Sequence, residues 1–361
     1  MIILGDIAAP NKGTAQDLQA VFKQNSTIFK DKLLVANLEG LINVSEEPLK
    51  RKTPVLFNHS ETIEVLSQWN TAAVALANNH TLDLPYQFKE TVRLLSVGNI
   101  GYTGAGASIN EAIAPARILD YGKDIWIFNY CWNFLFYHQN NPSNGVFLSD
   151  MNESKISRLI EQHRQQYPTS SIIVFFHWSF DLETLPTPMN REFAKHLIDL
   201  GVNVVVGCHS HCVQGGEQYK QGYIVYGLGN FFLPNNIFAS GKLAFPKWAT
   251  LQLALEWNPI TNKAICHWFE YALDGQQHKV NFIASEDFES SKILKQHSPF
   301  QNLSPEQYLQ LYKTKRRKKK FIPVFKDFRA TNENSLKLAF LKLRAHFARL
   351  MARFGFIQWQ H

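Results

Sequence analysis

Residues Val202-Asn-Val-Val-Val-Gly-Cys-His-Ser-His211 combine a short apolar, β-branched run with two histidines that follow it directly. Such a run predicts a buried strand, and Met189–Leu200 before it has helical spacing and ends at Gly201. Similar runs alternate with helical patterns up to about residue 230. The predicted strands are Ile2–Leu4, Leu33–Ala36, Ala72–Leu76, Ile125–Asn129, Ile172–Phe176, Val202–Val206 and Ile224–Tyr226. This alternation predicts an α/β protein with buried, largely parallel strands.

The composition excludes several classes of protein. The chain has 361 residues, 45% apolar and 19% charged, which suffices for a buried core and excludes a wholly disordered chain. Four cysteines are too few for a disulfide scaffold of this size. The apolar run from Ile125 to Tyr137 is too short to span a bilayer as a helix. Because the first residues resemble no secretory signal, we expect a cytoplasmic location.

The apolar pattern changes to period two between Trp248 and Phe282. Two alternating runs, Thr250–Trp257 and Ala264–Tyr271, flank the turn sequence Asn258-Pro-Ile-Thr-Asn262. This arrangement predicts an antiparallel hairpin.

Five of the apolar runs end in residues that can bind a metal or move a proton. These ends are Gly5-Asp6, Asn37-Leu-Glu-Gly40, Asn78-Asn-His80, His177 and the pair His209 and His211. Ligands of α/β sheets bind outside the carboxyl ends of the strands, so these side chains are expected to converge. The mixed oxygen and nitrogen set suits Mn, Fe or Zn, and a carboxylate such as Glu39 can bridge two cations. The sequence has neither a P-loop nor a Gly-x-Ser-x-Gly elbow.

Seven motifs together resemble one known family. They are Gly5-Asp6, Asn37-Leu-Glu-Gly40, Leu76-Ala-Asn-Asn-His-Thr-Leu-Asp83, Gly104-Ala-Gly106, His177-Trp178, Gly207-x-His-x-His211 and Tyr226-Gly-Leu-Gly-Asn-Phe231. Their order over residues 1–235 resembles the CapA family of poly-γ-glutamate capsule biosynthesis proteins, itself similar to calcineurin-like metallophosphoesterases. The resemblance implies a calcineurin-like metallophosphatase sandwich, with β-sheets flanked by helices, over residues 1–290. Residues 291–361 would form a basic linker and an amphipathic C-terminal helix.

The resemblance also implies roles for individual residues. One or two divalent cations (Mn, Fe or Zn) would be held by Asp6, Glu39, Asn79, His177, His209 and His211. His80 would be the catalytic general acid, with Asp83 orienting its ring. The residues expected to support the ligands or to contact the substrate are Asn37, Asp83, Trp178, Asp181 and Asn230.

The chain departs from the family pattern in the neighbourhood of these ligands. Asp6-Ile-Ala8 stands where Asp-x-His is usual, so one cation would be a ligand short. His177-Trp-Ser-Phe-Asp181 replaces His-Trp-Gly-x-Glu, and Cys208 and Ser210 stand where His and Pro are common. Such neighbours orient metal ligands, so the geometry around the cations is expected to differ.

Two functions follow from the resemblance. The first is a metal-dependent, phosphoesterase-like hydrolase of capsule or surface-polymer (poly-γ-glutamate-like) biosynthesis, acting on a phosphate ester or an anionic polymer. The alternative is a non-catalytic component of a capsule synthesis or export complex, which binds polymer or a partner in the same cleft.

The positive charge of the chain is concentrated in its last fifty residues. Residues 311–361 contain 14 Lys/Arg and two acids, a charge of +12; because the whole chain carries +7, residues 1–310 carry −5. We expect this segment to lie outside the α/β core, since the run Lys315–Lys320 is too repulsive to pack. We also expect it to bind an anionic surface, the inner face of a membrane. Nucleic acid is not an expected partner, because the rest of the chain offers no basic, aromatic face.

Beyond the lysine run, a basic amphipathic helix is expected to begin at the N-cap residues Asn334-Ser335. Its apolar stripe would consist of Leu336, Phe340, Leu343, Phe347, Leu350 and Phe354. The alternative for this helix is that the stripe docks on the rest of the protein.

Overall fold

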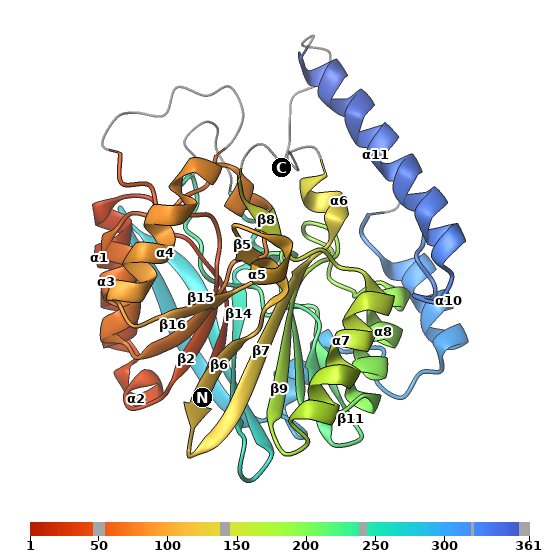
Figure 1. Cartoon of the computed structure of the whole chain (residues 1–361), viewed down its shortest axis with the longest axis horizontal. Helices are drawn as coiled ribbons and strands as arrows, with labels where there is room; N and C mark the ends of the chain where they lie inside the picture. The colour runs from red at the N-terminus through yellow and green to blue at the C-terminus, as the bar shows by residue number, and fades with distance from the viewer. Residues whose placement is uncertain (46–54, 138–144, 238–243, 319–320, 354–361) are drawn as a thin grey trace.

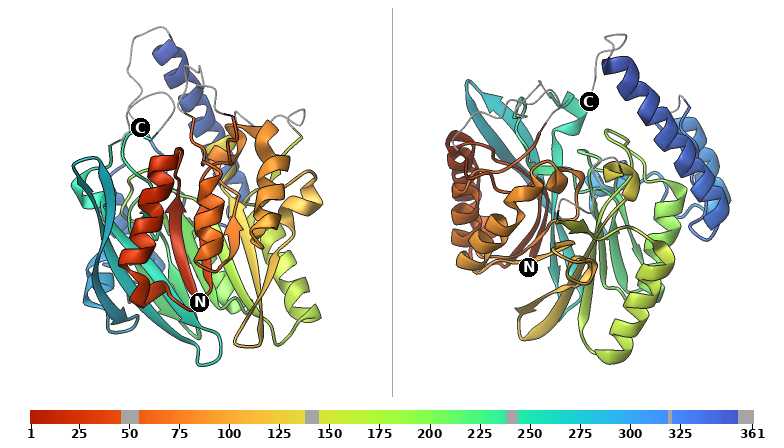
Figure 2. Two further views of the ribbon diagram at one scale, coloured as in Figure 1. Left: turned by 90° about the vertical axis from the view of Figure 1, so that its left-hand side faces the viewer. Right: turned by 45° about the horizontal axis from the view of Figure 1, so that its top comes forward.

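The computed structural model describes residues 1–45, 55–137, 145–237, 244–318 and 321–353. Two β-sheets lie face to face, and helices cover the outer face of each (Figures 1 and 2). The predicted sandwich of sheets flanked by helices is therefore confirmed.

The larger sheet has eight strands, in the order β16-β15-β14-β1-β2-β3-β4, and β13 also pairs with β1. Strands β1, β2, β3, β4 and β13 run parallel, whereas β14, β15 and β16 form an antiparallel extension. Their bounds are β1 (Ile2–Ile7), β2 (Leu34–Leu38), β3 (Thr71–Ala75), β4 (Gly101–Thr103), β13 (Asn230–Phe232), β14 (Leu251–Asn258), β15 (Lys263–Asp274) and β16 (Gln277–Asp287). The expected hairpin is thus present, and a third strand extends it.

The smaller sheet has six strands, in the order β11-β12-β10-β9-β7-β6. The central strands β12, β10, β9 and β7 are parallel, and an antiparallel strand closes each edge. Their bounds are β6 (Ala116–Asp120), β7 (Lys123–Cys131), β9 (Ser171–His177), β10 (Val204–Cys208), β11 (Gly216–Tyr219) and β12 (Gly222–Val225). A two-stranded sheet pairs β5 (Ala105–Gly106) with β8 (Phe147–Leu148).

Helices cover the outer faces of both sheets because their apolar sides pack on them. Over the larger sheet lie α1 (Lys12–Gln24), α2 (Ser26–Phe29), α3 (Glu61–Gln68) and α4 (Phe88–Val97), with core residues such as Phe22, Leu66 and Leu95. Over the smaller sheet lie α7 (Glu153–Gln166) and α8 (Pro188–Asp199), through residues such as Ile160 and Phe193. The remaining helices are α5 (Ile109–Ile113), α6 (Asn133–Phe136), α9 (Lys292–His297), α10 (Pro305–Lys315), α11 (Thr331–Arg353) and the short 3₁₀ turns η1 (Asn79–Leu82), η2 (Pro85–Gln87) and η4 (Lys247–Ala249).

A third apolar cluster fills the space between the sheets. Val35, Ile173, Val206 and Trp268 belong to it and are almost completely buried. This buried layer holds the two sheets in fixed register, so that the carboxyl ends of their parallel strands meet at one end of the molecule. Within the described ranges, no helix combines the length and the apolarity needed to cross a membrane.

The segment after residue 300 packs more closely than we expected. Tyr308 and Tyr312 of α10 and Leu341 of α11 are each only 1% exposed and join the apolar cluster of α7 and α8. The expectation that residues 311–361 lie outside the core is therefore wrong for this part of the segment. Aromatic residues between the charges, Phe325 and Phe328 among them, supply the apolar surface that the charge count conceals.

The basic run also packs, contrary to our expectation. Arg316 is 9% exposed, and the backbone N–H groups of Arg317 and Lys318 both donate to the buried carboxylate of Glu183. The negative charge of this carboxylate compensates the repulsion among the Lys and Arg side chains of the run, which the sequence alone suggests would prevent packing. Lys319 and Lys320, the end of the run, lie outside the described residues.

Helix α11 begins at Thr331, three residues before the expected N-cap. It packs through Leu341 and Leu338, whereas Leu336, Phe340, Leu343 and Phe347 of the expected stripe are exposed. Leu350 is half-buried, and Phe354 lies outside the described residues. The alternative in which the stripe docks on the rest of the protein is therefore wrong for these four side chains.

Candidate metal centre

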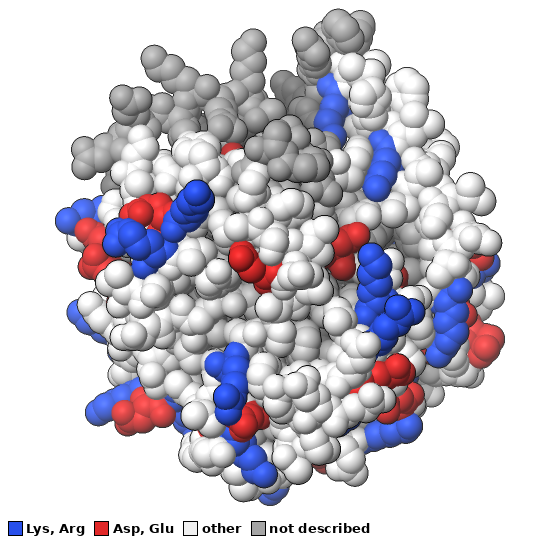
Figure 3. Space-filling view, viewed as in Figure 1, with Lys and Arg blue, Asp and Glu red and all other residues white. Residues whose placement is uncertain are grey.

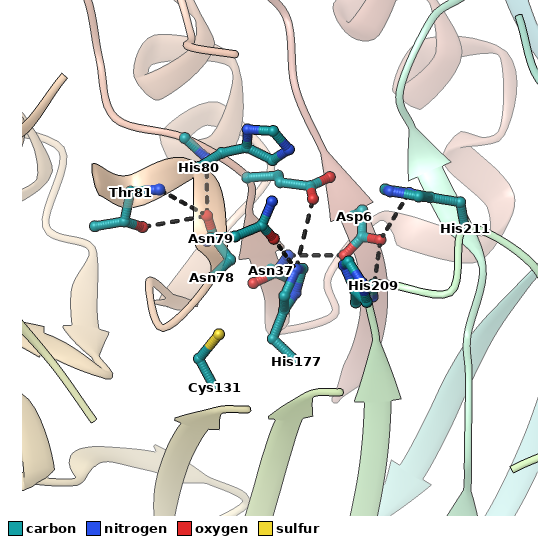
Figure 4. A network of polar contacts seen from close by, with 12 residues as sticks. Asp6, Asn37, Asn78, Asn79, His80, Thr81, Cys131, His177, His209 and His211 are labelled. Carbon is teal, nitrogen blue, oxygen red and sulfur yellow. Dashed lines mark hydrogen bonds and ion pairs between the residues drawn. The ribbon is translucent and has the colours of Figure 1, made fainter. Parts of the chain in front are cut away.

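The polar residues that follow the strands meet between the two sheets, at the carboxyl ends of β1, β2, β9 and β10 (Figure 4). Close approach of the backbone makes this possible at two glycines. A Cβ on Gly5 would lie 1.9 Å from the Gly229 carbonyl oxygen, and a Cβ on Gly207 would lie 1.9 Å from that of Tyr226. Any side chain at these positions would push the strands apart, so glycine is required here.

Asp6 lies at the centre of the network and is fully buried. Its Oδ1 accepts a hydrogen bond of 2.7 Å from the Asn37 amide, because β1 and β2 are neighbouring parallel strands. Its Oδ2 accepts the backbone N–H of His209 at 3.3 Å and lies 3.4 Å from His211 Nδ1. Asn230 Oδ1 lies 2.9 Å from the same His211 nitrogen. Asp6 is thus oriented by an amide, a backbone group and an imidazole.

Glu39 and His177 approach each other from the two sheets. Glu39 is fully buried and its Oε1 lies 3.7 Å from His177 Nε2, while Asn79 Oδ1 lies 2.8 Å from the same nitrogen. Neither carboxylate oxygen of Glu39 has a hydrogen-bond partner among the described residues. A buried carboxylate without a hydrogen-bond partner is costly, so Glu39 is the strongest indication that this site binds a positive group.

The three side chains of the Asn-Asn-His turn after β3 make different contacts. Asn78 caps the turn, since its Oδ1 accepts the backbone N–H groups of Thr81 and Gly40. In Figure 4 both side chains extend from the turn toward the network, Asn79 toward His177 and His80 farther from His177. His80 Nδ1 lies 2.7 Å from Asp83 Oδ2.

The loops after β9 and β10 carry backbone strain where they meet. His209 and His211 have φ angles of 87° and 54°, and Ser179 and Leu182 have 77° and 55°. Non-glycine residues adopt such angles where the surrounding structure imposes them, often at functional sites. The strained loops bring Asp181 Oδ1 to 3.2 Å from His209 Nε2.

Two groups of side chains have the geometry to hold a cation. Asp6, Glu39 and His211 form one, and Asp181, His209 and His211 form the other; within each, the ligand atoms lie within 4.8 Å of one another. His211 belongs to both, so the two groups adjoin. His177 contacts Glu39 of the first group, and Asn79 contacts His177.

Burial and neighbouring charges give the three histidines different pKa values. Burial lowers the pKa of His209 to about 4 and lowers that of His177 well below its usual value. Burial opposes the charge on His211 as well, but Glu39 and Asp6 outweigh it and raise its pKa to about 10. Burial and the Asp6 carboxylate raise the pKa of Glu39. His177 and His209 are therefore neutral, the form in which imidazole binds a metal.

The residues present fit a divalent metal. They comprise two buried carboxylates, an amide oxygen and three imidazoles, and the Nδ1 atoms of His177 and His209 also lack partners among the described residues. This mixed set of oxygen and nitrogen donors suits Mn, Fe or Zn.

The structure brings most of the sequence-predicted residues into this network. Asp6, Glu39, Asn79, His177, His209 and His211 converge, with Asn37 and Asn230 beside them. Trp178 does not: its indole N–H donates to the Tyr226 carbonyl and its ring stacks on Phe176 at 4.4 Å, inside the core. Asp181, expected in a supporting role, instead belongs to one of the two ligand groups.

Sequence analysis missed the capping role of Asn78 and the part played by Glu183. Asn78 has the sequence signal of an N-cap, an Asn before a turn, which could have revealed it. Glu183 follows the motif region with no local pattern, and only its contacts with residues 317 and 318 reveal it.

Comparison with known proteins places this chain within a described family. Residues 2–235 match a family model described as bacterial capsule synthesis protein PGA_cap. The capsule biosynthesis protein CapA of Bacillus anthracis is 25% identical over 180 residues, covering 47% of this chain and 42% of that protein. The PGA biosynthesis protein CapA of Bacillus subtilis is 26% identical over 222 residues, covering 59% and 56%. The chain thus spans about half the length of the curated relatives it matches.

Among solved structures, a novel phosphatase from Mycoplasma pneumoniae matches 79% of this chain and 91% of its own, with 14% identity and a TM-score of 0.44. A putative 5'-nucleotidase from Staphylococcus aureus matches 82% of this chain and 57% of its own, with 10% identity and a TM-score of 0.43.

Proposed function

Because this chain belongs to the bacterial capsule synthesis protein (PGA_cap) family, we propose that it is a metal-dependent, phosphoesterase-like hydrolase in the biosynthesis of a poly-γ-glutamate-like capsule or surface polymer. The observation that carries the proposal is the buried, unpartnered carboxylate of Glu39 beside Asp6 and three histidines. The negative charge of such a buried carboxylate is neutralised when a divalent cation binds.

Each of these residues would have its own role in the reaction. Asp6, Glu39 and His211 would hold one cation, with His177 and Asn79 adjoining, and Asp181 with His209 would hold a second. A cation there would polarise a phosphate oxygen of the substrate. With Nδ1 of His80 engaged by Asp83, Nε2 is the ring atom that would carry a proton to the leaving oxygen.

Two measurements on one preparation test the proposal. Protein purified without chelator is analysed for bound Mn, Fe and Zn, and its turnover is measured on a panel of phosphomonoesters and phosphodiesters. We expect one or two cations per chain and turnover of at least one ester. Glu39→Gln should lose the metal and the turnover, whereas Glu64→Gln, a surface substitution of equal charge change, should keep both.

The alternative, a non-catalytic component of a capsule synthesis complex, makes a different prediction. Metal bound at full occupancy with no turnover on any ester, in wild-type protein, would contradict the hydrolase and support the alternative. Absence of metal from protein reconstituted with Mn²⁺ would contradict the proposed metal centre itself.

A further inference from the structure

A basic pocket lies beside the candidate metal centre. It has a volume of about 480 Å³ and is lined by Leu182, Trp248, Arg316, Arg317 and Lys318. Three of these five residues are cations from the run that the sequence suggested would stay in solvent. The pocket therefore arises because this run folds back onto the protein.

Glu183 holds the basic run in place. This side chain is fully buried, and its oxygens accept the backbone N–H groups of Arg317 and Lys318, each at 2.9 Å. The same carboxylate accepts the N–H groups of Thr184 and Leu185. Glu183 thus contacts the backbone of the run, which leaves the positive side chains to line the pocket.

The guanidinium of Arg316 is the strongest sign that an anion binds here. The residue is 9% exposed, yet its Nε and Nη1 atoms have no hydrogen-bond partner within the described part of the chain. A buried charged donor without an acceptor is unfavourable unless a ligand supplies one. Guanidinium groups match the two oxygens of a carboxylate or phosphate, so the missing acceptor is an oxyanion.

Arg317 is also held in a defined position. Its guanidinium carbon lies 4.0 Å from the centroid of the Trp248 ring, a cation–π contact. Since the arginine is stacked before a ligand arrives, less side-chain entropy is lost when it binds one.

The pocket and the metal centre share a wall. Leu182, which lines the pocket, follows Asp181, whose carboxylate lies 3.2 Å from His209 Nε2. The backbone N–H of Leu182 donates to the Ser210 carbonyl, between His209 and His211, at 2.9 Å. The loop that carries Asp181 and Leu182 therefore lies between the metal centre and the pocket.

We propose that Arg316, Arg317 and Lys318 form an oxyanion-binding pocket, which takes a carboxylate or phosphate group of the same extended substrate that the metal centre binds. The link to the substrate rests on the proposed function; the binding of an oxyanion does not. The pocket would explain how a small metal centre selects an anionic polymer, since successive negative groups would contact two neighbouring sites.

Binding is measured by calorimetry with two probes, a poly-γ-glutamate oligomer and inorganic pyrophosphate, on protein with and without Mn²⁺. The double variant Arg317→Gln/Lys318→Gln should weaken binding at least about tenfold, because each removes a charge-assisted contact. The matched control Lys313→Gln/Lys315→Gln changes two exposed lysines at or just before the start of the same run and should bind as wild type.

The two probes separate the sources of the oxyanion. If the pocket variant loses only oligomer binding, the pocket takes a polymer carboxylate. If it loses only pyrophosphate binding, the pocket takes a phosphate group. Equal binding by the pocket variant and wild type, or equal losses in the pocket and control variants, would overturn the proposal. Because the readout is binding, a protein without turnover still tests the pocket, and Glu39→Gln should retain oligomer binding in the absence of metal.

A second surface carries an independent inference. Leu336, Phe340, Leu343, Phe347 and Met351 form an outward face of α11 and are 75%, 47%, 56%, 58% and 43% exposed. The opposite side of the helix is tied down, because Tyr137 Oη donates to the Lys342 carbonyl and Lys337 Nζ donates to the Val324 carbonyl. The apolar face is therefore presented outward by a fixed helix.

The charge around this face indicates its partner. Residues 331–353 contain five Lys/Arg and one acid, Glu333; Lys337 pairs with Glu333, Lys342 and Arg349 lie over the Tyr137 ring, and Arg344 is exposed. In Figure 3 the surface over the upper part of α11 is mostly uncharged, with basic side chains along it. Apolar side chains flanked by cations are typical of helices that lie in the interface of an anionic bilayer. We infer that α11 docks on an anionic membrane surface through this face.

Co-sedimentation with vesicles tests the inference. Vesicles of phosphatidylcholine with phosphatidylglycerol should bind the protein more tightly than phosphatidylcholine alone, and high salt should weaken the binding. Phe340→Gln/Phe347→Gln should reduce binding at least about tenfold, whereas Val97→Gln/Ile109→Gln, two exposed apolar residues elsewhere, should not. Equal recovery in the supernatant with and without acidic vesicles, or loss of a dimer as the sole effect of the α11 variant, would overturn it.

Discussion

His80 Nδ1 lies 2.7 Å from Asp83 Oδ2, one turn further along the chain, and the same carboxylate oxygen accepts the backbone N–H of Leu56 at 2.9 Å. Asp83 is therefore fixed between a backbone group and an imidazole, and it fixes the ring in turn. Asn79, between Asn78 and His80, points to His177 instead. The turn thus separates a residue that adjoins the candidate metal centre from the one that we propose moves a proton.

Replacing His80 should affect turnover and leave metal binding intact. We expect His80→Ala to lower kcat by about 10²–10⁴, the usual contribution of a positioned general acid, with the metal content unchanged. Asp83→Asn should lower kcat by less and leave KM similar, because it acts through the orientation of the ring. Loss of bound metal from His80→Ala, measured by elemental analysis, would make His80 a ligand and contradict this role.

Divalent cations should stabilise the protein through the buried carboxylates. Addition of Mn²⁺ should raise the unfolding temperature of metal-free wild-type protein, since only the folded chain assembles the ligands. Glu39→Gln should abolish this response while unfolding at or above the metal-free wild-type temperature, because it removes an unpartnered buried charge. Differential scanning fluorimetry, with Glu64→Gln as the control, would refute the prediction if both variants responded alike.

The buried pair of Arg191 and Glu217 should anchor the segment that carries the basic run. Arg191 Nε and Nη2 lie 2.7 and 2.9 Å from the two Glu217 oxygens, and its guanidinium also donates to the carbonyls of Leu303 and Phe300. Arg191→Met should lower the free energy of unfolding by about 3 kcal/mol, because the buried Glu217 loses its bidentate partner and keeps only Lys195 at 3.4 Å and the Tyr226 hydroxyl. The double variant Arg191→Met/Glu217→Met should be more stable than Arg191→Met; urea denaturation that showed the reverse would contradict this account.

Stability in acid should depend on Glu256. Burial alone would raise the pKa of Glu256, but His267 and Lys32 outweigh it and lower that pKa to about 2. The folded-state pKa lies below the unfolded value of about 4.3, so the contribution to stability is complete above that pH and is lost as the pH falls toward 2.

Glu256→Gln should therefore reduce the free energy of unfolding at pH 7 by about 1–3 kcal/mol and flatten its decline between about pH 5 and 2. Denaturation curves across this pH range would contradict the assignment if wild type and variant lost stability in parallel.

Much of the fold follows from local patterns in the sequence. The apolar runs and their helical partners predict the parallel strands, because burial on both faces requires continuous β-branched segments. The period-two pattern predicts the hairpin of β14 and β15, although it missed β16, in which Val280 alone is buried. The motif residues at strand ends predict the metal centre, since parallel strands bring their carboxyl ends to one edge.

Other features depend on contacts between segments far apart in the chain. Trp178 has the sequence position of a site residue, yet it packs in the core because the strand preceding it directs its ring toward Phe176 and Tyr226. Asp181 becomes a candidate ligand only because two strained loops meet. Neither the burial of Trp178 nor the position of Asp181 is indicated by the neighbouring sequence.

The C-terminal segment shows most clearly what the sequence determines and what the tertiary structure determines. Its charge and its helical spacing are properties of the sequence alone, and they predict a basic, amphipathic helix. Which face of that helix packs, and whether the basic run joins the protein, depended on the tertiary structure. The physical reason is that Glu183, 134 residues before Arg317, supplies a buried carboxylate that outweighs the repulsion among the cations. Packing through Leu341 then leaves the apolar stripe of α11 outward.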